Sequence, residues 1–492
     1  MNLRRAKHIV VTALALASLA LPARAQQPSG LDRISHIVVV FLENRSFDNM
    51  FGAFPSADGV ENAIKAGKHQ QRDLSGKLYE ELPPPIGAGA FDVSDNSSAI
   101  RSLPWPKLPN APFAIDKTFP SVGTSANTRD LVHRFYTNRA QINSGANDRF
   151  VAYSDAGGLA MGYYSKEAME NSALWKLARE NTLLDHFFMG ALGGSFLNHI
   201  YLACACGPVW TGAPDKERSK IDANGAPLAG SRPGVFEDNR VVATADGDIA
   251  INTIQSVYLN NGKQSALLPP QTQPTIGDRL SDKNVDWAWY SEGLDLASRN
   301  DRSEKESNFL EGSIRFQWHH QAFSYFKRFD PATEAGRAQR EHHLRDAARL
   351  DDDIAAGKLP PVVFYKPSGP LNQHPGYANL DKGDARVAEI AAKLAASPIK
   401  DSYVMIITYD ENGGFWDHVA PPAGAGDTAD FLGPGSRVPA LVISPFARKG
   451  VDSTPYDTGS VLKLITERFR LEPLPGKRVQ AVNSLSKSLK LD

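Results

Sequence analysis

The sequence predicts an α/β fold, organised as a three-layer sandwich with a mostly parallel central sheet. The chain has 492 residues, of which 42% are hydrophobic and 22% charged, so it carries enough apolar material for a large core. Short continuous apolar segments alternate with segments whose apolar residues recur every three or four positions. The first pattern is typical of strands buried on both faces and the second of amphipathic helices, so their alternation favours parallel strands joined by helices.

Six apolar segments are predicted strands: 36–42, 182–188, 285–291, 361–367, 403–409 and 438–444. Helical periodicity predicts helices over 165–181, 384–397 and 458–470, with Thr458 or Ser460 as the residue that caps the last one. The segments 83–113 and 211–280 fit neither pattern. We expect them to be insertions that wall a cleft.

The N-terminus is predicted to be a cleaved secretory signal peptide spanning residues 1–25. Positions 4, 5 and 7 are basic, an apolar run follows at 9–21, and small residues at 23 and 25 suit a cleavage site. A membrane anchor is the alternative, but this run is shorter than the roughly 20 residues that cross a bilayer. Whether the arginine pair belongs to a twin-arginine signal stays open. We therefore expect an exported protein, periplasmic or extracellular, with 26–492 as a single catalytic domain.

The charge of the chain is nearly balanced. The formal net charge is −1 and the isoelectric point is about 6.9. Such a chain has no basic surplus that would attract nucleic acid or an anionic membrane surface. The sequence therefore predicts no nucleic-acid partner and no stable membrane insertion, and it leaves the oligomeric state open.

The only two cysteines are Cys204 and Cys206. An exported protein meets an oxidising compartment, where such a pair can form a disulfide. In an extended strand, however, side chains two residues apart lie too far from each other for a disulfide. The sequence analysis therefore favours two small buried apolar residues without a covalent bond.

Oxygen ligands follow two of the predicted strands. Glu43 and Asn44 come directly after the strand at 36–42, and Asp410 and Glu411 come directly after the strand at 403–409. In a parallel sheet such groups collect at the carboxyl ends of the strands, and the glycine pair at 413–414 allows the turn that adjacent ligands need to converge. Three carboxylates and an amide suit Ca²⁺, Mg²⁺ or Mn²⁺, with Zn²⁺ as a further possibility. The alternative is that these groups only bind loop amides.

Ser195 follows Gly193 and Gly194 and begins a predicted helix, with Asn198 one turn further along. Backbone amides at the start of a helix attract a phosphate group or its transition state. The alternative is that Ser195 only caps the helix. The surrounding residues lack the G-x-S-x-G motif of α/β-hydrolases, which disfavours that fold.

Four of the twelve histidines are candidates for a phosphate pocket: His133, His319, His320 and His374. An imidazole can hold a phosphate oxygen or protonate a leaving group. A pocket rich in histidine predicts activity that peaks on the acid side of neutrality, because imidazolium holds phosphate better than imidazole does. A surface or structural role is the alternative for each of them.

Three long motifs, "HIVVVFLENRSFDNMFG", "GGSFLNH" and "TYDENGGFWDHVAPP", resemble a bacterial phosphoesterase family of secreted acid phosphatases and phospholipases C. The resemblance runs from about residue 34 to residue 469. It implies an alkaline-phosphatase-like α/β sandwich, metal-assisted hydrolysis of a phosphomonoester or phosphodiester, and a covalent phospho-enzyme. Carried over to this sequence, it implies Glu43, Asn44, Asp410 and Glu411 as metal ligands, Ser195 as the nucleophile, and His133, His319, His320 and His374 as phosphate-binding residues. We expect Ser195, Asn198 and His320 to be the catalytic residues.

Within this family the chain is more similar to the acid phosphatase branch, because many phospholipases C are longer and carry threonine as the nucleophile. We therefore expect a secreted, metal-dependent acid phosphatase that uses a phosphoserine intermediate. The alternative is a phospholipase C that cleaves phosphatidylcholine-type phosphodiesters. An exposed apolar rim would favour a lipid substrate, and Trp105, Phe113, Phe415 and Trp416 either form one or belong to the core.

Overall fold

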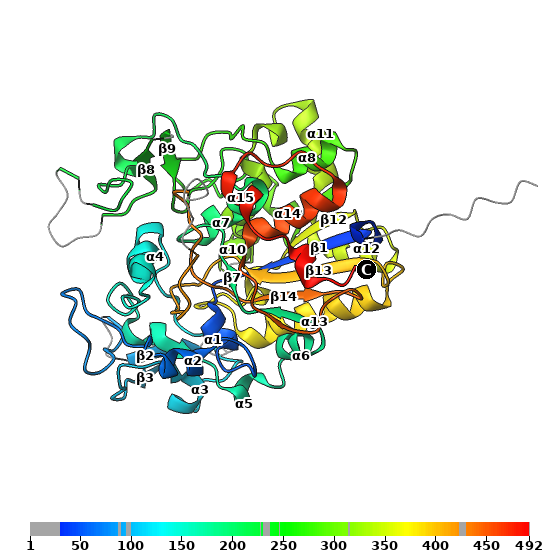
Figure 1. Cartoon of the computed structure of the whole chain (residues 1–492). Coiled ribbons are helices and arrows are strands. Elements are labelled where there is room, and N and C mark those ends of the chain that lie inside the picture. Colours follow the sequence, from blue (N-terminus) through cyan, green and yellow to red (C-terminus); the bar gives the residue numbers. More distant parts are fainter. Residues whose placement is uncertain are drawn as a thin grey trace, which may run out of the picture.

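In the computed structural model, an eight-stranded sheet in the order β11-β10-β12-β1-β13-β14-β6-β15 forms the centre of the molecule (Figure 1). The structure describes residues 30–86, 90–94, 100–226, 228–229, 237–245, 247–312, 315–422 and 430–491. The strands of the sheet are β1 (His36–Leu42), β6 (Thr182–Leu184), β10 (Trp287–Ser291), β11 (Leu344–Asp346), β12 (Val362–Lys366), β13 (Tyr403–Tyr409), β14 (Ala440–Ile443) and β15 (Gly450–Asp452).

The sheet is mostly parallel, as predicted. Strand β14 runs antiparallel to both of its neighbours, β13 and β6, whereas the other pairings are parallel. Strands β1, β12 and β13 are almost completely buried because both faces of the sheet are covered. Their continuous Val, Ile, Phe and Tyr content therefore reflects burial on two sides.

Helices cover the sheet on both faces, which gives the three layers (Figure 1). On one face α13 (Leu380–Ala396) contacts α6 (Ala173–Glu180) and α12 (Leu350–Ala355). On the other face α14 (Thr458–Phe469) contacts α7 (Ser195–Cys204) and α8 (Ile276–Asp282). The remaining α-helices are α1 (Phe47–Phe51), α2 (Val60–Lys65), α3 (Ile115–Thr118), α4 (Phe135–Ile142), α5 (Lys166–Met169), α9 (Leu294–Ala297), α10 (Glu304–Gly312), α11 (Glu334–His343) and α15 (Lys477–Ala481).

All three predicted helices differ from the structure near their starts, and α13 begins at Leu380, before the predicted residue 384, because Asn379 is its cap. The predicted helix over 165–181 is divided into α5 and α6, because Ser165 and Ser172 each cap a separate helix with their side chains. Helix α14 is capped by Asp457, and Ser460 completes a capping box as its third helical residue. The aspartate one position earlier was therefore the cap that the sequence analysis missed.

Both predicted insertions contain a β-hairpin that lies away from the central sheet (Figure 1). The first pairs β2 (Ala90–Ser94) with β3 (Ile100–Pro104), and the second pairs β8 (Val241–Thr244) with β9 (Gly247–Ala250). Short two-residue pairs, β4 (Phe113–Ala114) with β5 (Gly162–Tyr163) and β7 (Phe187–Phe188) with β16 (Tyr456–Asp457), connect the peripheral segments.

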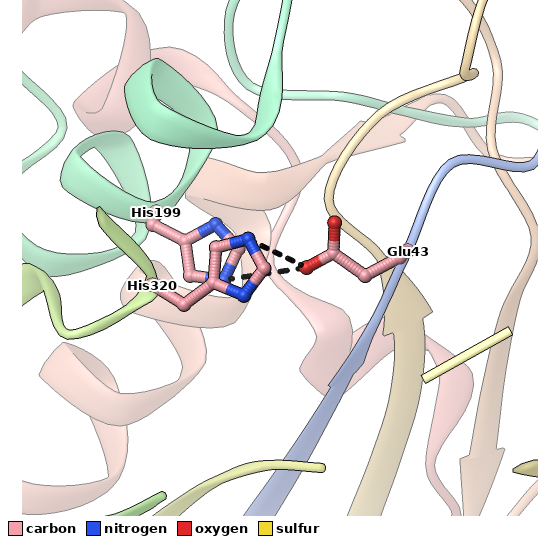
Figure 2. A group of neighbouring side chains, drawn as sticks. All are labelled: Glu43, His199 and His320. Atoms are coloured by element: carbon pink, nitrogen blue, oxygen red, sulfur yellow. Dashed lines mark ion pairs between the residues drawn. The ribbon is translucent and has the colours of Figure 1, made fainter. Parts of the chain in front are cut away.

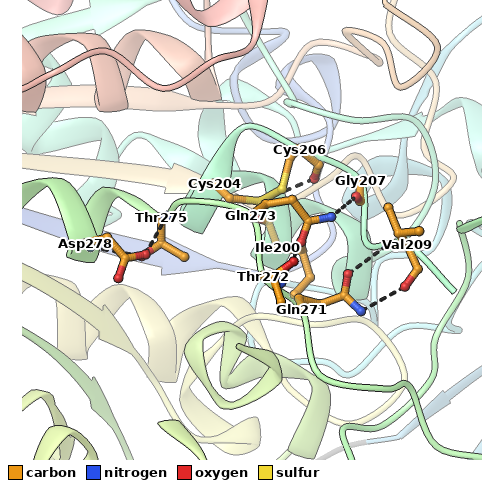
Figure 3. Close-up of a disulfide and its surroundings, with 10 residues drawn as sticks. All are labelled: Ile200, Cys204, Cys206, Gly207, Val209, Gln271, Thr272, Gln273, Thr275 and Asp278. Atoms are coloured by element: carbon orange, nitrogen blue, oxygen red, sulfur yellow. Dashed lines mark hydrogen bonds between the residues drawn. A yellow bond between two sulfur atoms is a disulfide. The ribbon is translucent and has the colours of Figure 1, made fainter. Parts of the chain in front are cut away.

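Cys204 and Cys206 form a disulfide, which corrects the prediction of two unbonded cysteines (Figure 3). The prediction assumed an extended strand, but Cys204 is the last residue of α7 and Ala205 adopts a left-handed conformation with φ of 49°. This reversal of the chain brings the two Cα atoms to 5.1 Å, within the range that a disulfide requires.

The predicted signal peptide, residues 1–25, lies outside the described residues. Within the part of the chain that is described, no helix has the length and apolar character needed to cross a membrane.

Candidate active site

The carboxyl ends of β1 and β13 bring the four predicted metal ligands together. Leu42 and Tyr409, the last residues of these strands, are paired in the sheet, so the residues that follow them leave the same edge. The backbone N–H of Asn44 donates a hydrogen bond to Asp410 Oδ1 at 3.0 Å. Glu43, Asn44, Asp410 and Glu411 are all fully buried.

The backbone turns sharply where these residues converge. Asn44 has a φ of 57°, in the left-handed region that asparagine tolerates better than most residues. Gly413 has a φ of 61°, and a Cβ atom there would lie 2.4 Å from the Asn44 carbonyl oxygen. Glycine is therefore required at position 413 so that the loop after β13 can pack against the loop after β1.

Several buried polar atoms at this edge have no hydrogen-bond partner. They are Asn44 Oδ1, Asp410 Oδ2, Glu411 Oε1 and His199 Nε2. Buried polar atoms are nearly always paired, so a group of unpaired acceptors in one place calls for a cation. The residues present therefore fit a bound metal ion, and three of the four unpaired atoms belong to ligands proposed from the sequence.

Lys366, at the end of β12, also reaches this site. Its ammonium group donates hydrogen bonds to Glu43 Oε1 and to the carbonyl oxygen of Phe41, and it is buried. Burial and the nearby Asp410 carboxylate raise the pKa of Glu43, while Lys366 opposes this shift. Sequence analysis missed this residue: a lysine that ends a buried apolar strand is unusual, but its partner Glu43 is revealed only by the pairing of β12 with β1.

His199 and His320 lie beside Glu43 (Figure 2). The two imidazole rings are stacked with centroids 4.5 Å apart, and their Nε2 atoms lie 3.9 and 3.3 Å from Glu43 Oε1. Together these three residues form a group that could hold a metal ion. His199 is a second residue that sequence analysis missed, and its signal was its position four residues after Ser195, on the same face of α7.

Ser195 does not cap α7. Gly194 occupies the N-cap position and Ser195 is the first helical residue, so the cap interpretation is wrong. The Ser195 hydroxyl instead donates a hydrogen bond to Glu43 Oε2 at 3.0 Å, and the residue is 5% exposed. Ser195 is therefore hydrogen-bonded to a residue of the candidate metal site.

Asn198 holds the loop that precedes Ser195. Its side-chain oxygen accepts a hydrogen bond from the Ala191 N–H at 2.8 Å, and its amide nitrogen donates to the carbonyl oxygens of Ala191 and Gly194. The side chain is fully buried. In this geometry Asn198 positions the serine loop rather than facing the carboxylates.

The remaining predicted histidines line the same edge of the sheet. His133 Nε2 lies 3.4 Å from the Asn44 side-chain nitrogen and 3.6 Å from Glu411 Oε1. The His374 ring lies 5.8 Å from the His133 ring, and His319 packs edge-on against His320 at 4.4 Å. The structure thus gathers all four histidines near the carboxylates.

Burial changes the charge expected for these histidines. It lowers the pKa of His199, His320 and His374, and it lowers the pKa of His319 to about 3 with a further contribution from Lys366. They are therefore neutral imidazoles near neutral pH. This contradicts the sequence-based argument that imidazolium ions hold the phosphate, because that argument used the pKa of exposed histidine.

Comparison with known proteins identifies the family. The model of the phosphoesterase family matches residues 34–472. The chain belongs to the phosphoesterase family. Curated relatives are phospholipase C B of Mycobacterium tuberculosis, with 26% identity over 91% of this chain and 75% of that protein, and the non-hemolytic phospholipase C of Pseudomonas aeruginosa, with 23% identity over 92% and 56%. This phosphoesterase is therefore a hydrolase that acts on phosphoric ester bonds.

Solved structures with a related arrangement include the phosphonate monoester hydrolase of Silicibacter pomeroyi, with a TM-score of 0.32 and 9% identity over 66% of this chain and 73% of that one. A protein of the alkaline phosphatase superfamily from Vibrio parahaemolyticus has a TM-score of 0.30 and 12% identity over 66% and 65%.

A second buried charged group in the phosphoesterase involves His418. Its Nδ1 lies 2.7 Å from Asp48 Oδ2, and Arg437 bonds both Asp48 and Asp417 at 3.0 and 2.9 Å. These residues also have the spacing of metal ligands, but the guanidinium group already supplies the positive charge between the carboxylates. His418 is thus part of an ion-pair network.

The aromatic residues considered for a lipid-binding rim belong mostly to the core of the phosphoesterase. Phe113, Phe415 and Trp416 are 8%, 0% and 2% exposed, and Trp105 packs against Phe113 with ring centroids 5.8 Å apart. Burial on this scale leaves little of their surface for an acyl chain.

Proposed function

We propose that this phosphoesterase is an exported, metal-dependent phosphatase that hydrolyses phosphomonoesters through a phosphoserine at Ser195. The observation that carries the proposal is the hydrogen bond from the Ser195 hydroxyl to Glu43, within a group of buried, unpaired ligand atoms. A serine that only stabilised the helix would not need this partner. A nucleophile does, because its hydroxyl must be positioned and must lose its proton.

Glu43, Asn44, Asp410 and Glu411 would hold the metal ion, with His199 and His320 beside them. The oxygen ligands favour Ca²⁺, Mg²⁺ or Mn²⁺, and the imidazoles are compatible with Mn²⁺ or Zn²⁺. When bound, such an ion lowers the pKa of the attacking hydroxyl and offsets the charge of the phosphoryl group.

The residues of the chain then supply the nucleophile, transfer the proton and bind the phosphoryl oxygens. The bond from Ser195 Oγ to phosphorus forms as the bond to the leaving oxygen breaks, and the hydroxyl proton passes to Glu43 Oε2 and then to the released alcohol. A water molecule then attacks phosphorus as the bond to Ser195 Oγ breaks, one proton of the water passes to Ser195 Oγ, and inorganic phosphate leaves. The backbone N–H groups at the start of α7 would hold the phosphoryl oxygens, with the imidazoles of His133, His319 and His374 around them.

The curated relatives are phospholipases C, and this favours a phospholipase C as the second candidate. Two features support the phosphatase instead: three of the four aromatic residues considered for a lipid-binding rim are buried, and the cleft beside Ser195 is lined largely by polar residues. An acidic pH optimum rests on the resemblance to the acid phosphatase branch alone, because the buried histidines are neutral.

Export through the predicted signal peptide places the enzyme in the periplasm or outside the cell. The Cys204–Cys206 disulfide supports this location, because disulfides persist in oxidising compartments. We further propose that residues 26–492 act as one catalytic domain whose insertions wall the cleft.

The proposal is tested with purified protein and three substrates: p-nitrophenyl phosphate, p-nitrophenylphosphorylcholine and phosphatidylcholine vesicles. We expect the highest kcat/KM for p-nitrophenyl phosphate and, after rapid acid quench, phosphate on a peptide that contains Ser195. A higher kcat/KM for either choline ester would establish the phospholipase activity instead. If turnover is normal and no phosphopeptide forms, the phosphoserine mechanism is wrong and water attacks the phosphorus of the substrate directly.

A further inference from the structure

A cleft of about 630 Å³ opens beside the nucleophile and extends over the second insertion. Its inner end is formed by Gly194, which precedes Ser195, and by His133, which contacts Asn44. Its outer wall is formed by residues 239–240 and 251–253, next to β8 and β9. A phosphate ester bound at Ser195 would therefore direct its organic group into this cleft.

The walls of the cleft present hydrogen-bonding groups. Asp130, Arg134 and Thr253 are exposed, and Asn239 and Arg240 are half-buried. By contrast Leu131, Phe196 and Ile251, which also line the cleft, are at most 1% exposed, so their side chains belong to the core. A bound molecule thus meets both donors, from arginine and asparagine, and acceptors, from aspartate and threonine.

Most charges in these walls are already balanced. Arg240 Nη1 lies 2.9 Å from Glu217 Oε2, and Arg134 donates a hydrogen bond to the carbonyl oxygen of Asp238 and lies 3.9 Å from its carboxylate. Paired arginines offer little to a second phosphate group. Among the described residues that line this cleft, Phe196 is the only Phe, Tyr or Trp, so these residues form no aromatic cage for a quaternary ammonium group.

We propose that the alcohol released from this site is uncharged and carries several hydroxyl groups, as a sugar or glycerol does. The inference rests on the proposed phosphatase function and specifies its substrate class. A hydroxyl group both donates and accepts, so several of them match the mixed donors and acceptors of the walls. An alkyl or acyl chain would strip water from the charged side chains and return no hydrogen bond, which disfavours it.

The test compares glucose 6-phosphate with n-hexyl phosphate, two primary alkyl phosphates of similar size that differ mainly in their hydroxyl groups. We expect kcat/KM to be at least about tenfold higher for glucose 6-phosphate, because a site that bonds hydroxyl groups rejects an analogue that lacks them. In the double variant Asn239→Leu/Thr253→Val this preference should fall about tenfold, because kcat/KM for glucose 6-phosphate falls while that for n-hexyl phosphate does not. Thr272→Val, an exposed threonine outside the cleft, is the matched control and should keep the preference.

Each outcome separates this inference from the phosphatase proposal. If p-nitrophenyl phosphate is hydrolysed and the two alkyl phosphates react equally well, the inference is wrong and the phosphatase proposal stands. Equal losses for both substrates in the double variant would also overturn it, because they would indicate a structural defect. If no phosphomonoester is hydrolysed while phosphatidylcholine vesicles are, both proposals fail.

Discussion

Replacing Ser195 with alanine removes one hydroxyl group and leaves the rest of the candidate site in place. The hydroxyl makes one hydrogen bond, to Glu43 Oε2 at 3.0 Å, and it has no role as a helix cap. Glu43 keeps its contact with Lys366 in the variant. The perturbation therefore affects the proposed nucleophile far more than it affects packing or helix formation.

The structure sets the expected size of the two effects. Loss of one hydrogen bond costs about 1 kcal/mol, so we expect Tm to fall by about 2 °C or less in a chain of this length. Loss of the nucleophile should lower kcat at least about 10³-fold, because the covalent route is closed. Ser195→Thr keeps a hydroxyl group and should retain partial activity.

The assay measures kcat with p-nitrophenyl phosphate, Tm by calorimetry and bound metal by elemental analysis. Ser172→Ala is the matched control, because Ser172 caps α6 by accepting a hydrogen bond from the Trp175 N–H. This control should lose about 1 kcal/mol of stability and keep its turnover. If Ser195→Ala behaves like Ser172→Ala, with modest destabilisation and near-normal kcat, Ser195 is not the nucleophile.

Three further predictions use the metal site, the charged network and the disulfide. Exhaustive chelation should abolish activity. It should also lower the free energy of unfolding by about 2.7 kcal/mol if the ion was present at a hundredfold excess over its Kd, and in Asp410→Asn the chelator should no longer change the stability. Activity that persists with zero bound metal would contradict the metal site. Burial lowers the pKa of His418 but its carboxylate partner raises it further, so the folded value exceeds the ordinary one near 6.5. The stabilisation is complete below that pH and is lost as pH rises through the folded pKa, so the Tm advantage over His418→Gln should shrink as the pH is raised above about 6.5. A difference that stays constant with pH would refute this. Cys204→Ser should lower the free energy of unfolding by about 1.5 kcal/mol, because the closed loop is very short, and an unchanged denaturant midpoint would show that the bond adds nothing.

The sheet and the converging carboxylates could be predicted because their signals are local. The strand that ends at Leu42 and the strand that ends at Tyr409 are each recognisable from continuous apolar residues, and acidic ligands follow both. The parallel arrangement then places the two strand ends at one edge. Lys366 could be placed only once the pairing of β12 with β1 was known, because nothing near it in sequence indicates its partner Glu43.

The chemical state of the histidines and the cysteines depends on the three-dimensional surroundings. The low pKa of His319 results from burial and from Lys366, which lies far from it in sequence. The Cys204–Cys206 disulfide depends on one left-handed residue at the end of α7, and alanine at position 205 gives no sequence signal for that conformation. Propensity and periodicity describe which elements form, but they do not describe the environment that shifts a pKa or reverses the chain.

Lys366 also determines the electrostatic balance of the site. When Glu43, Asp410 and Glu411 are all ionised, three carboxylates and one ammonium group leave a net charge of −2, with neutral imidazoles around them. One divalent cation makes this group electrically neutral. A phosphate dianion can then approach without long-range repulsion, whereas the same pocket without the lysine would keep an excess negative charge that opposes the substrate and slows its encounter with the enzyme.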